Sequence, residues 1–363
     1  MSIEQRSGYE REDTTDPVTG RKLMRMTTFP AHDIQPYYDI CPWSPDGSKI
    51  VFSSAMPEEL VDAGGIMTTR RGHLFVMDAD GQNIERLTGD APFDSHTGAF
   101  PLWTPEGTRI VYGNGMKPSR VHVLNLGDRS VETFDGVQPR QLSPDGTRLL
   151  CQSPNGVEVL HMNDGHREVV LTFEQLLDAI PPYDAERASD PTACNLKWSP
   201  DGSRFLLRFS FSPGEYMKSL FVASADGSEL RRIDRASTSF HHHSWHPDGE
   251  RILYGDYDRP DEPRYYFIDR EGRERVEVTG ELILGHPFLN PDATRIISDN
   301  YHEKLGHRIL QIDVGTGSVE TLASFTVNLK RSNAHPTWNR DGSQVIYHSD
   351  HIGTSQLYVV DVD

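Results

Sequence analysis

The strongest constraint on the fold is a short turn motif that recurs seven times along the 363 residues. Each copy has a Trp or Leu, then a turn built on Pro-Asp-Gly or a variant of it, and then a β-rich run. Pro presets φ and Asp-Gly tolerates unusual backbone angles, so each copy predicts a β-hairpin. Such self-similarity indicates a repeat architecture. The copies begin at Trp43, Trp103, Leu142, Trp198, Trp245, Leu289 and Trp338.

A second hairpin usually follows the turn motif, as in segments 73–88, 219–233 and 307–322. Each repeat therefore predicts four short antiparallel strands, which is the composition of a propeller blade. The acidic turn residues recur about every 49 residues, close to the length of known blades. We predict an all-β, seven-bladed β-propeller of four-stranded antiparallel blades, with one helix near 172–180.

The two ends of the chain complement each other. The last repeat stops after its third strand, at 356–362, and segment 20–27 matches the fourth strand at 81–88. Pairing of the two would close the ring and remove exposed sheet edges. We predict an N-terminal tail over 1–19, and a single propeller domain over 20–363 whose last blade is completed by the N-terminal strand.

Composition argues against several classes of protein. Lys and Arg number 36 against 54 Asp and Glu, a net charge of −18, which disfavours nucleic-acid and anionic-membrane partners. No apolar run is long enough to span a membrane. The polar start has no secretory signal, and the three Cys have no Cys-x-x-Cys spacing, so we expect a cytoplasmic protein. The oligomeric state is left open.

The repeat also predicts where a site would lie. In a propeller, residues just before each innermost strand lie at one mouth of the central channel. Three residues before the Trp or Leu of the turn motif stand His242, His286 and His335 in three consecutive blades, and Asn195 in the blade before them. We expect these side chains to converge, with Asn333 able to join. Converging neutral imidazoles are metal ligands first and general bases second. The alternative is that each His is structural, as most buried polar groups are.

The same mouth receives the loops between second and third strands. These loops hold polar and aromatic groups in segments 256–260, 299–304 and 348–351, which would suit a sugar or another polar ligand. Exposed loops are commonly polar in any case. In the run 241–243, alternation allows only some members to face the channel, and the phase selects His242.

The turn motif resembles the TolB-type propeller repeat over nearly the whole chain. Segments 239–249, 285–292 and 332–350 are similar to a narrower family, the oligogalacturonate lyases. Those are cytoplasmic seven-bladed propellers that cleave short pectin fragments by β-elimination, using a divalent metal that is typically manganese. The resemblance implies a small acidic oligosaccharide as substrate and Mn²⁺ as cofactor, with Ca²⁺, Mg²⁺ or Zn²⁺ as alternatives.

The resemblance also implies roles for individual residues. His242 matches the catalytic base of the family, and His286 and His335 match metal-binding histidines. Asn333 stands where the family usually has another metal-binding His. The family's Arg before the third strand of the fourth blade has no match, and Lys218 is the nearest cation, which implies a catalytic role for Lys218.

The chemistry requires cations. Elimination from a uronate removes the proton beside the carboxylate, and a metal on that carboxylate stabilises the developing charge. A net charge of −18 opposes an anionic substrate, so local cations must offset it. The family's metal-binding Gln has no match, since Lys330 and Arg331 stand there. The expected substrate-binding residues are Asn195, Tyr257, Arg259, His302, Lys304 and Arg331.

Two further functions are compatible with the sequence. A non-catalytic, TolB-like scaffold would tolerate loss of the in-phase histidines and bind no metal. Another metal-dependent, sugar-active propeller enzyme, such as a lactonase or epimerase, would be favoured by carboxylates at the in-phase positions, which show none.

Overall fold

The computed structural model describes residues 3–186, 188–189, 191–212, 217–233, 240–257, 259, 261–302 and 306–362. The chain forms two compact units, which we call unit 1 (1–135 and 288–363) and unit 2 (136–287). Unit 1 contains four antiparallel sheets and unit 2 contains three. These sheets are the blades of a seven-bladed β-propeller, so the predicted fold class is confirmed. The single-domain boundary at 20–363 stays a prediction.

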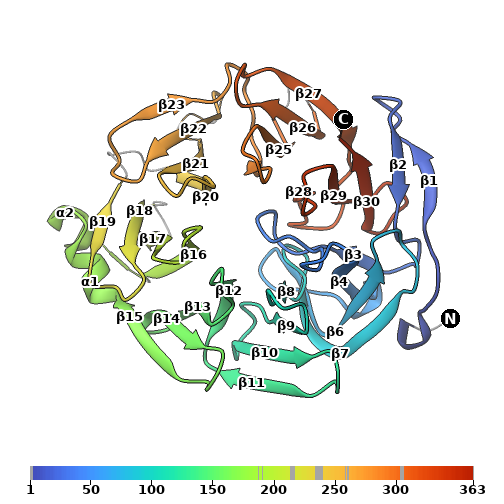
Figure 1. Ribbon diagram of the computed structural model, residues 1–363, viewed down its shortest axis with the longest axis horizontal. Coiled ribbons are helices and arrows are strands. Elements are labelled where there is room, and N and C mark those ends of the chain that lie inside the picture. The colour runs from blue at the N-terminus through green and yellow to red at the C-terminus, as the bar shows by residue number, and fades with distance from the viewer. Residues whose placement is uncertain are drawn as a thin grey trace. The chain divides into compact units, whose positions relative to one another are not determined.

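Unit 1 holds blades 1, 2, 6 and 7, numbered in chain order (Figure 1). Blade 1 consists of β3 (His32–Ile34), β4 (Lys49–Ala55), β5 (Val61–Asp62), β6 (Met67–Asp78) and β7 (Glu85–Asp94). Blade 2 consists of β8 (Leu102–Trp103), β9 (Arg109–Tyr112), β10 (Arg120–Asn125) and β11 (Val131–Asp135). Blade 6 consists of β24 (Phe288–Leu289), β25 (Arg295–Asn300), β26 (Arg308–Asp313) and β27 (Val319–Ser324). Blade 7 consists of β28 (Thr337–Trp338), β29 (Gln344–Ser349), β30 (Gln356–Asp361), β2 (Lys22–Arg25) and β1 (Glu12–Thr15).

Unit 2 holds blades 3, 4 and 5. Blade 3 consists of β12 (Gln138–Leu142), β13 (Arg148–Ser153), β14 (Gly156–His161) and β15 (Arg167–Thr172). Blade 4 consists of β16 (Thr192–Trp198), β17 (Arg204–Ser212), β18 (Met217–Ser224) and β19 (Leu230–Arg232). Blade 5 consists of β20 (Phe240–Trp245), β21 (Arg251–Asp256), β22 (Arg264–Asp269) and β23 (Arg275–Glu277).

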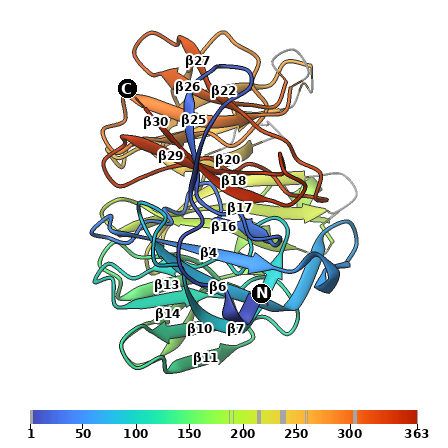
Figure 2. The same cartoon turned by 90° about the vertical axis from the view of Figure 1, so that its right-hand side faces the viewer.

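The N-terminal strand completes the last blade, as predicted. Strand β2 pairs antiparallel with β30, and β1 adds a further strand outside β2 (Figure 1). Strand β1 falls within the segment 1–19 that we expected to be a tail. The chain before it forms a short 3₁₀ helix, η1 (Ile3–Gln5), and lies beside β6 and β7 (Figure 2).

The recurring Trp has a structural reason. Trp103, Trp245 and Trp338 each donate their indole N–H to a backbone carbonyl at the inner strand of the preceding blade, at 2.8–3.0 Å. Their rings are buried in apolar clusters that lie between neighbouring blades of the same unit. A buried Trp needs such a partner for its N–H. The motif therefore specifies blade-to-blade contact as well as the turn.

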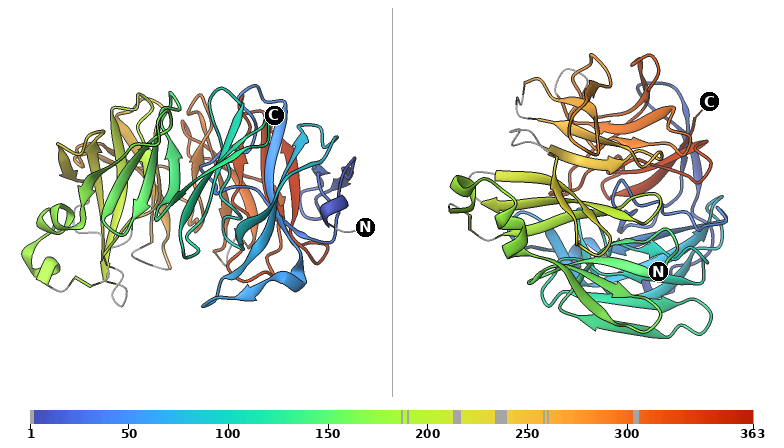
Figure 3. Two further views of the ribbon diagram at one scale, coloured as in Figure 1. Left: turned by 90° about the horizontal axis from the view of Figure 1, so that it is seen from below. Right: turned by 60° about the vertical axis from the view of Figure 1, so that its left-hand side comes forward.

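Helix is scarce, as expected. Helix α1 (Phe173–Asp178) begins at Thr172, whose side chain forms a capping box with Gln175. Helix α2 (Pro182–Glu186) follows it, and both lie outside the strands of their unit (Figure 3). Unit 1 adds the short η2 (Pro57–Glu59). Of the helices formed by the described residues, none has the length and apolar character needed to cross a bilayer.

Candidate functional site

In four of the seven blades, the in-phase residue has an unusual backbone conformation. Phe100, Asn195, His242 and His335 have φ values of 54°, 52°, 49° and 46°. Such left-handed conformations are uncommon outside Gly, although Asn and His tolerate them better than most residues. They cost about 1–3 kcal/mol each and cluster at functional sites. The register also shifts at this point in β16 and β20, so each strand has a bulge that redirects its side chains.

Unit 2 brings two of the predicted histidines together. The ring centroids of His242 and His286 lie 3.9 Å apart. Burial, followed by the proximity of His286 and His241, lowers the pKa of His242 well below its usual value. The imidazole of His242 is therefore neutral at pH 7 and can accept a proton or bind a metal ion.

Tyr257 connects these two histidines. Its hydroxyl donates to the carbonyl of Gly285 at 2.5 Å and accepts from the Gly285 N–H at 3.3 Å. The same oxygen lies 3.5 Å from Nδ1 of His242. The substrate-binding role expected for Tyr257 stays a prediction, but its hydroxyl proton is already used within the protein.

Lys218 lies beside this group. Its ammonium group donates to Nε2 of His241 at 3.4 Å, and the His241 ring stacks on Tyr257 with a centroid distance of 5.0 Å. Burial and the nearby Arg208 lower the pKa of Lys218 to about 8. Burial and Lys218 lower the pKa of His241 to about 3, so His241 accepts as a neutral ring.

The third histidine of the run, His243, has a structural position. It is fully buried, and its Nε2 lies 3.0 Å from the backbone oxygen of Asn195. Lys197 donates its ammonium group to the backbone oxygen of His243. These contacts link the first strands of blades 4 and 5 and fix the backbone of both Asn195 and His242.

Unit 1 places His335 in a second aromatic group. The His335 ring is fully buried and packs edge-on against Tyr37 at 4.8 Å and His96 at 4.7 Å. Nδ1 of His96 lies 3.2 Å from the backbone oxygen of Arg331. Sequence reasoning did not identify Tyr37 or His96. His96 lies in the connection between β7 and β8, and Tyr37 lies between β3 and β4, a few residues before the turn motif. Closeness to the turn motif is the signal that could have found them.

Buried polar groups hold the His335 segment in place. Gln35 donates its amide to the His335 carbonyl at 2.8 Å, and the His335 N–H donates to Asp299 at 3.2 Å. His348 lies between Ser332 and Gln35, at 2.8 Å from each. Asp299 and His348 come from loops that we expected to face a ligand, and both are buried in this network instead.

The remaining expected residues differ in exposure. Arg259 is exposed, and its guanidinium pairs with Glu262 at 3.1 Å. Arg331 is exposed and has a φ of 55°. His302 and Asn333 are half-buried. Lys304 lies outside the described residues.

The imidazoles of these groups are chemically suitable ligands for a divalent metal ion, but too few of the imidazoles that the structure describes lie together to complete a site. Among the in-phase histidines, His242 contacts His286 in unit 2, and His335 contacts His96 in unit 1. Imidazole nitrogen binds Zn²⁺, Mn²⁺ and related ions. Within the described part of the chain, no three His, Cys, Asp or Glu side chains lie close enough together to hold one ion.

Comparison with known proteins supports the fold. No family model matches the sequence. An oligogalacturonate lyase in complex with manganese has a TM-score of 0.75 and 17% identity, covering 97% of this chain and 96% of that one. An oligogalacturonate lyase from Vibrio parahaemolyticus has a TM-score of 0.74 and 16% identity, covering 98% and 97%. A chain of a mitotic checkpoint complex has a TM-score of 0.57 and 16% identity, covering 91% of each. The same fold thus occurs in enzymes and in a protein assembly, so function has to be argued from the site.

Proposed function

We propose that this protein is a metal-dependent lyase that cleaves short uronate-containing oligosaccharides by β-elimination. The observation that carries the proposal is the pair of His242 and His286, with His242 half-buried, neutral and held at a left-handed backbone position. Two solved structures of the same fold are named oligogalacturonate lyases, and an oligogalacturonate is a uronate-containing oligosaccharide. These names support the choice of reaction.

In the proposed reaction, His242 is the base. Its neutral imidazole takes the proton from the carbon beside the uronate carboxylate. The electron pair of that C–H bond forms the new double bond, and the glycosidic C–O bond at the adjacent carbon breaks. The leaving oxygen takes a proton from water, so the products are an unsaturated uronate and a shortened sugar. A neutral base of this kind typically contributes about 100- to 10,000-fold to a rate.

The resemblance implies His286 and His335 as metal ligands, and we propose that role for each of them. A bound divalent ion would hold the substrate carboxylate and stabilise the negative charge beside it. The amide of Asn333 is a weaker metal ligand than the His that the resemblance implies at this position. The imidazole of His96, which contacts the His335 ring, is a further candidate ligand. Lys218 would offset the charge of an acidic substrate, which the net charge of −18 otherwise repels.

The test combines metal content with turnover. The purified protein is loaded with Mn²⁺, its bound metal is measured, and short oligogalacturonides are added while the ultraviolet absorbance of the new double bond is followed. We expect His242→Ala to retain metal and to lose turnover by about 100- to 10,000-fold. His286→Ala and His335→Ala should each lose metal. The matched control is His161→Ala, in β14 of unit 2.

Two results would contradict the proposal. Unchanged turnover in His242→Ala would remove the base assignment. Absence of both bound metal and product, across a panel of acidic oligosaccharides, would favour the non-catalytic scaffold, and turnover of a neutral sugar lactone instead would favour the lactonase alternative.

A further inference from the structure

We propose that Tyr257 is a positioning residue that holds the His242 ring in the tautomer with its proton on Nδ1. The inference deepens the proposed function and rests on it, because it explains how Nε2 of His242 is kept available as a base.

The hydroxyl of Tyr257 has one proton to donate. The Gly285 carbonyl is 2.5 Å away, which is the length of a strong hydrogen bond, and it can only accept. The hydroxyl hydrogen therefore points to Gly285. The same oxygen accepts the Gly285 N–H at 3.3 Å, so it also presents acceptor capacity to a further neighbour.

That neighbour is Nδ1 of His242, 3.5 Å away. If Nδ1 carried no hydrogen, two lone pairs would face each other, which is unfavourable. If Nδ1 carries the hydrogen, it donates to Tyr257 in a long hydrogen bond. Catalytic hydrogen bonds are often long before the substrate binds and shorten in the complex. The geometry thus favours the Nδ1–H tautomer and leaves the lone pair on Nε2.

The position of the Tyr257 ring is itself fixed. The ring stacks on His241 with 27° between the planes. It also lies against Gly255, where an added Cβ would come within 2.5 Å of the ring and its hydroxyl. Only Gly leaves this space, and the close approach explains the presence of a Gly inside β21. The same hydroxyl contacts both His242 and the residue before His286, so one side chain sets their relative position.

The test reads the tautomer directly. The protein is labelled with ¹⁵N-histidine, and long-range ¹H–¹⁵N spectra are recorded at neutral pH without substrate, with the His242 signals assigned from their loss in His242→Gln. We expect a protonated Nδ1 and a bare Nε2 in the unmodified protein. In Tyr257→Phe, which keeps the ring and removes the oxygen, we expect a mixture of the two tautomers. Tyr266→Phe, in β22 of the same blade, is the matched control and should leave the His242 signals unchanged.

The kinetic counterpart separates positioning from binding. Tyr257→Phe should lower kcat by about 2- to 5-fold with little change in KM, because only the fraction of molecules in the Nδ1–H tautomer presents a basic Nε2. An Nε2–H tautomer in the unmodified protein would overturn the inference even if the variant failed to fold, as would an unchanged tautomer in Tyr257→Phe. A tautomer that changes as expected, in a protein that turns over no acidic oligosaccharide, would uphold the positioning role and overturn the proposed lyase activity.

Discussion

Three adjacent histidines in this chain have three different environments. His241 stacks on Tyr257 and accepts from Lys218, His242 faces His286, and His243 is buried against Asn195. In a regular strand, adjacent side chains alternate between the two faces of the sheet, so three consecutive residues could point in only two directions. The bulge in β20 supplies that third direction. The local backbone, more than the residue type, therefore decides which imidazole is available for chemistry.

Lys218 gives the first prediction, which concerns pH. Burial and the positive charge of Arg208 lower its pKa to about 8. Cys194 and His241 also lie near its ammonium group. The pKa is lowered, so the ammonium charge is present below pH 8 and is lost as the pH rises through 8. We expect KM for acidic oligosaccharides to rise about 5- to 10-fold between pH 7 and pH 9, the size of a modest ion pair.

Substitutions distinguish this charge from other effects of pH. Lys218→Arg keeps its charge at pH 9 and should flatten the KM profile, whereas Lys218→Gln should show the high KM at every pH. Lys49→Gln, at the exposed ion pair with Asp78, is the control. A KM for Lys218→Gln equal to that of the unmodified protein at pH 7 would show that Lys218 does not contact the substrate.

The sequence identified part of this site for a reason that can be stated. The phase of the repeat selected His242 and His286, because equivalent positions of neighbouring blades lie at the same level of the fold, and the two rings do meet. It did not identify His96 or the contacts of Tyr257, because these side chains come from connections whose length and path differ between blades. It also placed His348 at a ligand, whereas the side chain is buried between two neighbours.

At the scale of the element, the turn motif is a small hydrogen-bonding unit. In blade 4 the carboxylate of Asp201 accepts from the Ser199 hydroxyl at 2.6 Å and from the Ser203 N–H at 3.0 Å. Gly202 follows with a φ of 68°, which explains the Gly of the motif. The same sequence pattern predicted the turn that follows the Trp or Leu in each blade. It could not predict β1 or β5, which are short strands that exist only because a neighbouring edge is available.

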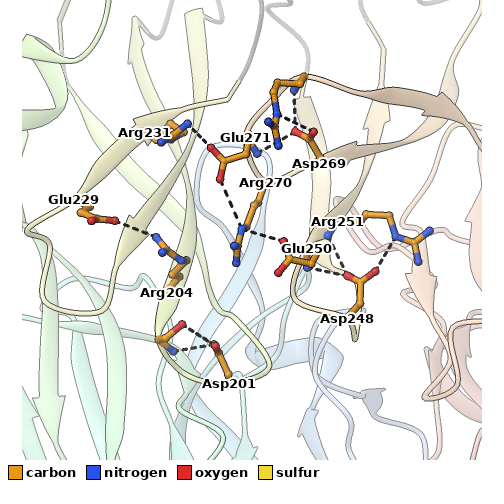
Figure 4. A network of polar contacts seen from close by, with 12 residues as sticks. Asp201, Arg204, Glu229, Arg231, Asp248, Glu250, Arg251, Asp269, Arg270 and Glu271 are labelled. Atoms are coloured by element: carbon orange, nitrogen blue, oxygen red, sulfur yellow. Dashed lines mark hydrogen bonds and ion pairs between the residues drawn. The ribbon is translucent and has the colours of Figure 1, made fainter.

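Exposed ion pairs supplement these turns in unit 2. Figure 4 shows Arg231 paired with Glu271, and Arg270 paired with both Glu271 and Glu250, so that charged side chains of β19 in blade 4 meet those of the β22–β23 turn in blade 5. Exposed pairs of this kind contribute little each and are screened by salt. The turn carboxylates, which are fixed by several donors, are the better candidates for a measurable effect.

Asp201 provides the second prediction of this kind, on stability. The Ser199 hydroxyl, followed by the Ser203 N–H, lowers the pKa of Asp201 to about 2, below the ordinary 3.8. Its stabilising effect is therefore present above about pH 4 and is lost as the pH falls to 2. Because the carboxylate is exposed, we expect Asp201→Ala to cost about 1 kcal/mol or less at pH 7, and still less near pH 2.

The measurement is the thermal midpoint as a function of pH. The difference between Asp201→Ala and the unmodified protein should shrink steadily from pH 5 to pH 2. The exposed Asp261→Ala serves as the control for loss of a surface charge. A difference that stays constant across this range would show that the carboxylate charge has no part in holding the turn.

At the scale of the whole molecule, the N-terminal segment joins several blades of unit 1. Strand β2 pairs with β30 of blade 7. Asp16 accepts from the N–H and hydroxyl of Ser324, both at 2.7 Å, at the end of β27 in blade 6. Arg6 reaches Asp33 in β3 of blade 1. Only the β2 pairing was predictable, since strand patterns are visible in a sequence and the partners of single charged side chains are not.

Arg6 is the buried cation among these connections and carries the last prediction. The residue is 2% exposed, and its guanidinium binds the carboxylates of both Asp33 and Glu10 and lies 5.1–5.3 Å from the centres of three Phe rings. Burial disfavours its charge, but Asp33 and Glu10 outweigh that effect and raise its pKa. Removing Arg6 would leave the fully buried Asp33 without this cation, a situation that costs about 3–5 kcal/mol.

We therefore expect Arg6→Ala to lower the midpoint of urea unfolding strongly. Arg21→Ala, which removes an exposed ion pair with Glu320 from the same segment, should cost less than about 1 kcal/mol. The double variant Arg6→Met/Asp33→Asn should recover part of the loss, because it removes the uncompensated buried charge as well as the ion pair. If Arg6→Ala were no more harmful than Arg21→Ala, the N-terminal segment would be dispensable for the stability of unit 1, and the pairing of β2 with β30 alone would complete the last blade.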